Sequence, residues 1–178
     1  MGQRITTALI AVPILLLVIW VGDPLFTLMI VAVTLLGLWE FYDVVSHRWG
    51  RPFVFLGALG ALIFIINAFA GDSANMPLVA LGVLAISVVW LLTQGRGRGS
   101  FTSWAWTLAG VFFLGWTLGY FVLLRNVSSG REWVIVVLFT IFAADTAAFF
   151  VGKAIGKTPL APSISPQKTW EGAVGGLL

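Results

Sequence analysis

The sequence contains no cysteine and a single histidine, His47. Disulfide bonds and thiolate metal sites are therefore excluded, and a cluster of imidazole ligands cannot form. Charged residues are also scarce, at 10% of the 178 residues, whereas ordinary soluble domains carry roughly 25%. A soluble fold of this size could not bury so many apolar residues. Much of the chain must therefore be surrounded by a lipid bilayer.

Apolar residues make up 60% of the sequence, and the mean hydropathy is +1.03. Six stretches approach the roughly 20 residues that a helix needs to cross a membrane. These stretches are continuous and do not alternate, which favours helices over a barrel. The sequence predicts an all-α, polytopic integral membrane protein with six transmembrane helices, at about 5–21, 25–42, 53–70, 77–93, 104–124 and 133–151.

Lysine and arginine are unevenly distributed between the predicted loops. With the N-terminus in the cytoplasm, only Arg125 and Arg131 of the 10 basic residues lie outside, as the positive-inside rule requires. The inside set is Arg4, Arg48, Arg51, Arg96, Arg98, Lys153, Lys157 and Lys168. We read the basic loop 95–99 as part of this signal rather than as a nucleic-acid site, so no nucleic-acid partner is expected. The N-terminus and the segment 153–170 are both predicted on the cytoplasmic face of the cell inner (plasma) membrane.

Residues 171–178 resemble the first two turns of a seventh helix. Eight helical residues rise about 12 Å, far less than a hydrocarbon core of ~30 Å. We therefore expect the chain to be truncated at its C-terminus. Residues 1–178 are interpreted as one transmembrane domain, with a cytoplasmic active-site loop at 152–170.

Asp145 lies deep in the apolar run 133–151. An acid at a helix centre costs roughly 2.5–3.5 kcal/mol on insertion scales, so such a residue usually faces a polar cavity and has a function. The alternative is a structural hydrogen bond to a neighbouring helix. Glu40 lies nearer a predicted helix end and beside Asp43, where an interfacial acid is the simpler interpretation.

The segment after the last full span is rich in glycine, lysine and proline. Glycines at 152 and 156 allow close approach of a ligand, and Lys153 and Lys157 supply positive charge. Further on, Ser165 followed by Pro166 is typical of a helix N-cap with proline in the first turn.

That cap would place Lys168 in the first turn of a helix, where free amides and the helix dipole favour phosphate. Glu171 could then bind a divalent cation or orient Lys168, or it could simply be a favourable acid near a helix start. Gly172, Gly175 and Gly176 would let another helix or a lipid headgroup come close. The residues alone indicate phosphate chemistry on a lipid.

Three segments in the last quarter of the chain resemble the phosphatidate cytidylyltransferases, or CDP-diacylglycerol synthases. That family carries an Asp-Ser/Thr-Gly/Ala-Ala-Tyr/Phe segment, a Gly-Lys/Arg loop and a Ser-Pro-x-Lys-Thr-Trp-Glu-Gly stretch. Here they correspond to 145–149, 152–157 and 165–172. Ala147, Phe149 and Gln167 are mild departures. The Lys-Asp pair, His-Gly-Gly stretch and aspartate-rich end of the family are absent, so the resemblance implies that this chain is an incomplete and inactive fragment.

The resemblance also implies a reaction and its participants. The phosphate of phosphatidate would attack the α-phosphorus of CTP, giving CDP-diacylglycerol and pyrophosphate, with Mg²⁺ neutralising the triphosphate charge. Asp145, Lys168 and Glu171 would be catalytic, with Asp145 as a metal ligand. Lys153, Lys157, Ser165 and Thr169 would bind substrate. The implied partners are CTP, phosphatidate and membrane lipid, with a homodimer as a possible assembly.

Two other classes of function remain open. One is a related polytopic lipid kinase, or a cytidylyltransferase for another lipid phosphate. The other is a transporter in which Asp145 relays a proton or cation. A transporter gives no reason for the Ser-Pro-x-Lys-Thr pattern, and it would be expected to show repeated halves, which the sequence lacks.

Overall fold

The structure is a computed structural model that describes residues 2–71, 73–93, 100–162 and 165–178. The basic loop 95–99 and Asp72 lie outside the described residues. The chain divides into two compact units, Met1–Arg131 and Glu132–Leu178. Helices and strands run in the order α1 Gly2–Val21, α2 Leu25–Ser46, α3 Val54–Phe69, α4 Met76–Thr93, α5 Ser100–Gly110, η1 Val111–Trp116, α6 Thr117–Asn126, α7 Gly130–Ile155, β1 Pro159–Ala161, β2 Ser165–Thr169 and α8 Trp170–Leu177.

The described residues include four helices that are long and apolar enough to cross a membrane. They are Leu25–Ser46, Met76–Thr93, Phe101–Asn126 and Gly130–Ile155. Each contains one of the predicted spans, so a helical membrane protein is confirmed. The predicted spans at 5–21 and 53–70 fall on α1 and α3, whose apolar stretches Ala11–Val21 and Val54–Phe69 are shorter. The count of six spans therefore stays a prediction.

Turns between the helices of the first unit use the conformational freedom of glycine. Gly22 follows α1 with a φ of +84°, and Gly71 follows α3 with a φ of +78°. L side chains rarely adopt this left-handed region, whereas glycine enters it at no steric cost. The Asp23 carboxylate then accepts hydrogen bonds from the amide and hydroxyl of Thr27, which fixes the first turn of α2.

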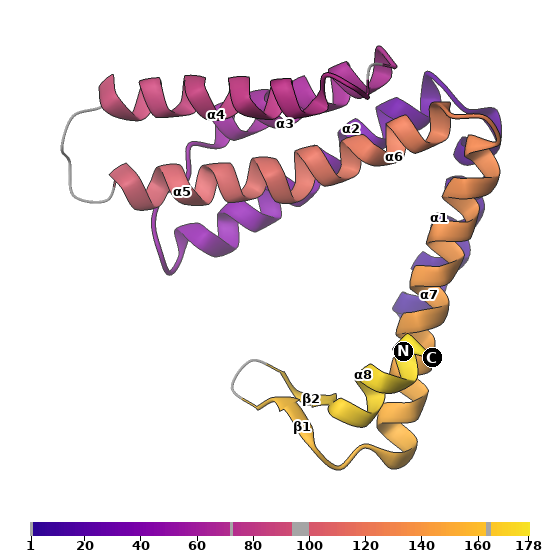
Figure 1. Cartoon of the computed structure of the whole chain (residues 1–178). Helices are drawn as coiled ribbons and strands as arrows, with labels where there is room; N and C mark the ends of the chain where they lie inside the picture. The colour runs from indigo at the N-terminus through magenta and orange to yellow at the C-terminus, as the bar shows by residue number, and fades with distance from the viewer. Residues whose placement is uncertain (1, 72, 94–99, 163–164) are drawn as a thin grey trace. The chain divides into compact units, whose positions relative to one another are not determined.

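The third membrane helix contains a short π-helical segment. Figure 1 shows α5, η1 and α6 as one continuous helix, which passes close to α3. A Cβ added to Gly115 in η1 would lie 2.5 Å from the Cα of Ala61 in α3. Glycine at this position therefore lets the two helix backbones approach closely, as small residues do in membrane helix pairs.

Tyr42 fills the core of the first unit. Its ring, only 2% exposed, comes from α2 and lies against Gly57 of α3 and Gly110 of α5. Its hydroxyl donates a hydrogen bond of 2.7 Å to the Thr107 carbonyl. Three helices are thus joined by one side chain that satisfies its polar atom in an apolar environment.

We expect the substitution Gly57→Ala to lower stability, because the added Cβ would lie 2.7 Å from two carbons of the Tyr42 ring. Overpacking of this kind costs about 1–3 kcal/mol. Gly82→Ala in α4 is the matched control, since nothing lies within 4 Å of its added Cβ. Alanine there should be neutral or stabilising by up to about 1 kcal/mol. Thermal unfolding in detergent measures both; equal unfolding midpoints for the two variants would contradict the close packing.

Candidate active site

α7 carries the first group of predicted site residues. Asp145 lies ten residues before the end of α7, or about 15 Å along the helix, and its side chain is exposed in the structure. Phe149 and Lys153 follow at intervals of four residues, which places all three on one side of the helix. The Lys153 ammonium lies 5.9 Å from the centre of the Phe149 ring. The side of α7 that carries Asp145 therefore ends in the positive charge of Lys153, close to the C-terminus of the helix.

α8 packs on the last turns of α7 through small residues. A Cβ on Gly172 would lie 2.8 Å from the Ala148 carbonyl oxygen and 3.1 Å from the Gly152 Cα. A Cβ on Gly176 would lie 2.8 Å from the Ala144 carbonyl oxygen, one turn earlier. The expectation that these glycines admit another helix is confirmed, and that helix is α7.

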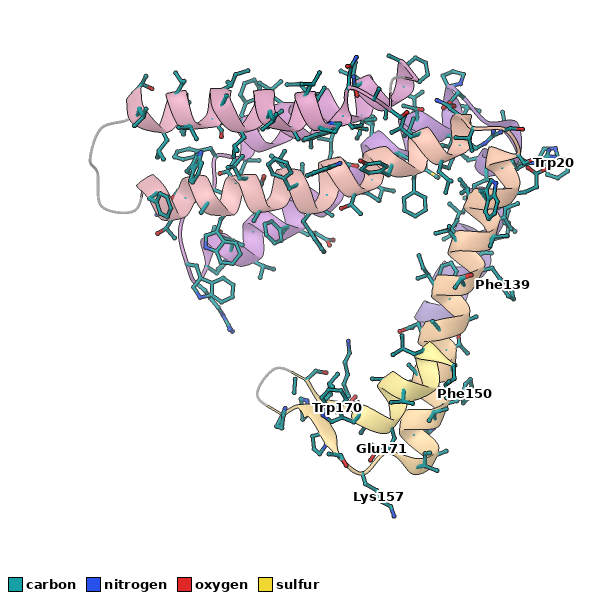
Figure 2. All side chains as sticks on the ribbon, viewed as in Figure 1. Trp20, Phe139, Phe150, Lys157, Trp170 and Glu171 are labelled. Carbon is teal, nitrogen blue, oxygen red and sulfur yellow. The ribbon has the colours of Figure 1, made fainter. Side chains whose placement is uncertain are left out.

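Glu171 fixes the loop that leaves α7. Its carboxylate accepts hydrogen bonds from the Lys157 amide, the Thr158 amide and the Thr158 hydroxyl, at 3.2, 3.2 and 2.9 Å. Figure 2 shows Glu171 beside this loop, with the Lys157 side chain extending away from α8. The expected loop at 152–157 is in part helical, because residues 152–155 form the last turn of α7. The short segment 156–158 that follows is held at the end of α7 by these hydrogen bonds. The predicted catalytic role of Glu171 stays a prediction.

We expect the Glu171 carboxyl to titrate far below the ordinary glutamate pKa of 4.5. Hydrogen bonds from its own amide, from the Thr158 hydroxyl and from the amides of Thr158 and Lys157 lower its pKa to about 2. Because the folded pKa is below the unfolded value, the ionised carboxylate stabilises the loop above pH 4.5, and this contribution is lost as the pH falls toward 2.

Carboxyl ¹³C resonances of protein labelled at glutamate test this directly. Glu171→Gln identifies the Glu171 signal, because the chain has only two other glutamates, Glu40 and Glu132. Thr158→Ala removes one hydroxyl donor and should raise the titration midpoint toward 4.5. A Glu171 midpoint already near 4.5 in the parent protein would show that these hydrogen bonds do not form.

The predicted helix N-cap at Ser165 is wrong. Residues Ser165–Thr169 form β2, which pairs antiparallel with β1, with Pro159 opposite Thr169 and Ala161 opposite Ser165. The cap is Thr169, whose hydroxyl accepts a hydrogen bond of 3.2 Å from the Gly172 amide. The Ser-Pro signal is local, whereas strand pairing and the capping hydroxyl four residues later determine where the helix begins.

Lys168 consequently lies in β2 and not in a first helical turn. Its side chain is exposed, two residues before α8 begins. The hydroxyl of Thr169 lies close to a glycine in the last turn of α7 and to one just after it, since an added Cβ on Gly152 would lie 3.2 Å from it and one on Gly156 2.6 Å. Whether Lys168, Ser165 or Thr169 contacts substrate stays a prediction.

The described residues contain no group of three or more His, Asp or Glu side chains placed to hold a metal ion. Glu171 already accepts hydrogen bonds from Lys157 and Thr158. Of the two acidic residues on α7, both exposed, Glu132 lies in the first turn and Asp145 lies nearer the end that leads into the loop. Mg²⁺ at nucleotide sites is commonly held by one or two carboxylates together with phosphate oxygens and water. Asp145 therefore fits a site shared with a nucleotide, and does not form a protein-only site.

Sequence reasoning missed the hairpin of β1 and β2 and the role of Thr158. Thr158 contributes its amide and hydroxyl to Glu171, and its carbonyl accepts a hydrogen bond of 3.0 Å from the Trp170 amide. The proline-rich composition of 159–166 disfavours helix, and this was the signal that could have indicated extended chain.

The fold and this site define a helical membrane protein with a basic segment, containing two glycines, where a membrane-spanning helix ends. The chain matches the model of the Cytidylyltransferase family over residues 2–178, and it belongs to that family. No solved structure matches the chain significantly.

Relatives in several bacteria are phosphatidate cytidylyltransferases. The chain is 35% identical over 176 residues to that of Brucella suis biovar 1, covering 97% of this chain and 62% of the relative. It is 32% identical to that of Pseudomonas aeruginosa, covering 98% and 66% of the two chains. The Bacillus subtilis relative is 27% identical, with 100% and 68% covered. The chain thus spans less than two thirds of the length of the Brucella and Pseudomonas relatives.

Proposed function

We propose that this protein transfers CMP from CTP to phosphatidate, giving CDP-diacylglycerol and pyrophosphate for phospholipid synthesis. Membership of the cytidylyltransferase family and the names of the bacterial relatives support this reaction. The structural observation that carries it is the loop at the end of α7. Glu171 holds this loop by its backbone, while the side chains of Lys153 and Lys157 remain exposed.

The proposed reaction needs positioning and charge neutralisation more than it needs a base. The phosphate of phosphatidate is already ionised at neutral pH, so its oxygen can attack the α-phosphorus directly as pyrophosphate leaves. Lys153, Lys157 and Lys168 would balance the negative charge of the triphosphate and the lipid phosphate. Asp145 would share a Mg²⁺ ion with the nucleotide, and that ion would supply further neutralisation of the leaving pyrophosphate.

The proposed arrangement has six membrane spans, with the N-terminus and the loop after α7 on the cytoplasmic side of the inner membrane, where CTP is available. The uneven distribution of the 10 lysine and arginine residues supports this orientation. We also propose that the protein forms a homodimer, which a measurement of its oligomeric state in detergent tests.

Single cysteines test the orientation without background, because the natural chain has none. We expect Arg51→Cys and Lys157→Cys to react with a membrane-impermeant maleimide only after the cells are opened. Ser128→Cys, in the loop before α7, should react on intact cells. Labelling of Lys157→Cys from outside would overturn the orientation.

The activity assay compares two proteins. One is the 178-residue chain, and the other is a chimera that continues after residue 178 with the corresponding part of the Brucella suis relative. We expect the chimera to form CDP-diacylglycerol from radiolabelled CTP and phosphatidate in the presence of Mg²⁺, and the 178-residue chain alone to be inactive. A correctly folded chimera without this activity would contradict the proposal. Phosphorylation of a lipid with ATP would instead indicate the kinase alternative.

A further inference from the structure

Thr158 lies between the end of α7 and the start of β1, directly before the hairpin of the second unit. Its carbonyl accepts a hydrogen bond of 3.0 Å from the Trp170 amide. This bond extends the antiparallel pairing of Pro159 with Thr169 by one position. The backbone of Thr158 is therefore fixed against the first residue of α8.

The side chain of Thr158 makes a second connection to α8. Its hydroxyl donates a hydrogen bond of 2.9 Å to Oε1 of Glu171, the second residue of that helix. The other carboxylate oxygen, Oε2, accepts hydrogen bonds from the amides of Lys157 and Thr158, both at 3.2 Å. Because donors engage both oxygens, rotation of the carboxylate is restricted. The Thr158 hydroxyl thus helps to hold Glu171 in the orientation that bonds the Lys157 amide.

The bond to the Lys157 amide fixes the point from which the Lys157 side chain extends. This side chain is exposed and points away from α8 (Figure 2). A lysine carries its charge on a flexible four-carbon stem, so the region that the charge reaches depends on where the backbone is held. The Glu171 carboxyl, whose pKa is lowered to about 2, is ionised at neutral pH and able to accept these bonds.

We propose that Thr158 is a positioning residue, which acts through the Glu171 carboxylate to place the Lys157 ammonium for the phosphates of a nucleoside triphosphate. This inference rests on the proposed reaction, in which Lys157 balances the negative charge of CTP. The Thr158 hydroxyl is already engaged by Glu171, so the residue acts through its neighbours and not by contact with the substrate.

Thr158→Val in the chimera removes the hydroxyl and keeps the shape of the side chain. Thr158 is exposed, so the change disturbs no core packing. A charge that attracts the triphosphate equally in the ground state and in the transition state affects KM. We therefore expect KM for CTP to rise about three- to tenfold, with kcat within about twofold of the parent. Loss of a hydrogen bond to an ionised group can weaken binding on the order of 10–10²-fold, and the flexible lysine should recover part of that loss.

Two further threonine variants separate positioning from a general effect on the fold. Thr158→Ser keeps the donor and should restore KM for CTP to within about twofold of the parent. Thr140→Val in α7 is the matched control, because Thr140 is exposed and its hydroxyl donates to the Val136 carbonyl at 2.8 Å. It should leave KM and kcat unchanged. A role of Thr158 in stability alone predicts a parent KM for the folded fraction of Thr158→Val, which would overturn the proposal.

A double-mutant cycle shows whether Thr158 acts through Lys157. Lys157→Met removes the charge and should itself raise KM for CTP. Adding Thr158→Val to this variant should raise KM by less than about twofold more, because the charge to be placed is gone. If the two changes instead multiply in their effects on KM, Thr158 does not act through Lys157 and the proposal fails.

The step from the hydroxyl to the Lys157 amide can be measured in the 178-residue chain itself. Thr158→Val should speed hydrogen exchange of the Lys157 amide several-fold, because the carboxylate that accepts from this amide loses one of its restraints. Thr140→Val should leave this exchange rate unchanged. An unchanged rate in Thr158→Val would show that the hydroxyl does not hold Glu171 over the amide, and would contradict the proposal.

Equilibrium binding of radiolabelled CTP to the chimera, with Mg²⁺ and without phosphatidate, separates this inference from the proposed reaction. If the folded chimera binds CTP but forms no CDP-diacylglycerol, the reaction fails. The inference is then judged by Kd for CTP, with the same weakening of about three- to tenfold expected for Thr158→Val. If the chimera forms CDP-diacylglycerol with equal Kd and KM in the parent and in Thr158→Val, the reaction stands and the inference is overturned. A folded chimera that binds no CTP overturns both.

Discussion

Replacing Lys168 with methionine in the active chimera should lower turnover about 10²–10³-fold while leaving the fold intact. Methionine keeps the apolar stem of the side chain and removes its charge. If the lysine stabilises charge that develops on the triphosphate, the loss of one such contact costs about 2.7–4 kcal/mol in the transition state. Lys168 is exposed on β2, so its replacement disturbs no core packing.

Gln167→Met is the matched control for Lys168. Gln167 is the preceding residue of the same strand, is equally exposed and carries no charge. Turnover per folded molecule, corrected by yield and by thermal unfolding in detergent, should be near that of the parent. If Lys168→Met folds normally and retains more than about a third of the parent rate, a loss below 1 kcal/mol, Lys168 does not belong to the site.

Asp145→Asn should lower turnover about 10–100-fold. Losses of this size are typical when a group that orients a metal or its ligands is removed. Asparagine keeps the size of the side chain and removes its negative charge, and it is no harder to bury in a membrane helix than aspartate. We therefore expect normal insertion and yield. Raising the Mg²⁺ concentration should restore part of the activity if Asp145 shares the ion with the nucleotide.

Asp43→Asn makes the same chemical change near the end of α2, in the other unit of the chain. This variant should keep near-parent turnover, because Asp43 is exposed and is placed by its helix beside His47. A structural role for Asp145, such as a hydrogen bond to another helix, predicts a lower unfolding midpoint with near-normal turnover of the folded fraction. That result would remove Asp145 from the proposed site.

The amino-acid sequence alone is enough to predict a helical membrane protein. Runs of apolar residues near 20 in length, with few charges, have no stable alternative to a helix in a bilayer, because every backbone group must be bonded within its own segment. The same local rule gave the spans 25–42, 77–93, 104–124 and 133–151, each inside a helix of the structure. The motif at 165–172 also sufficed to indicate the family, which the comparison then showed.

Only the tertiary structure shows which contacts the motif residues make. A Ser-Pro pair resembles a helix cap wherever it occurs, but the start of α8 depends on pairing of β2 with β1 and on the Thr169 hydroxyl. The sequence leaves Glu171 as a metal ligand, a partner of Lys168 or an acid near a helix start, and these roles stay predictions. Its hydrogen bonds from Lys157 and Thr158, 14 and 13 residues earlier, are seen only in the structure. Likewise, the glycines at 172 and 176 indicated a close approach, but only the structure identified α7 as the helix they contact. Contacts between residues so far apart along the chain have no periodic signal in the sequence, because backbone pairing and packing in three dimensions determine them.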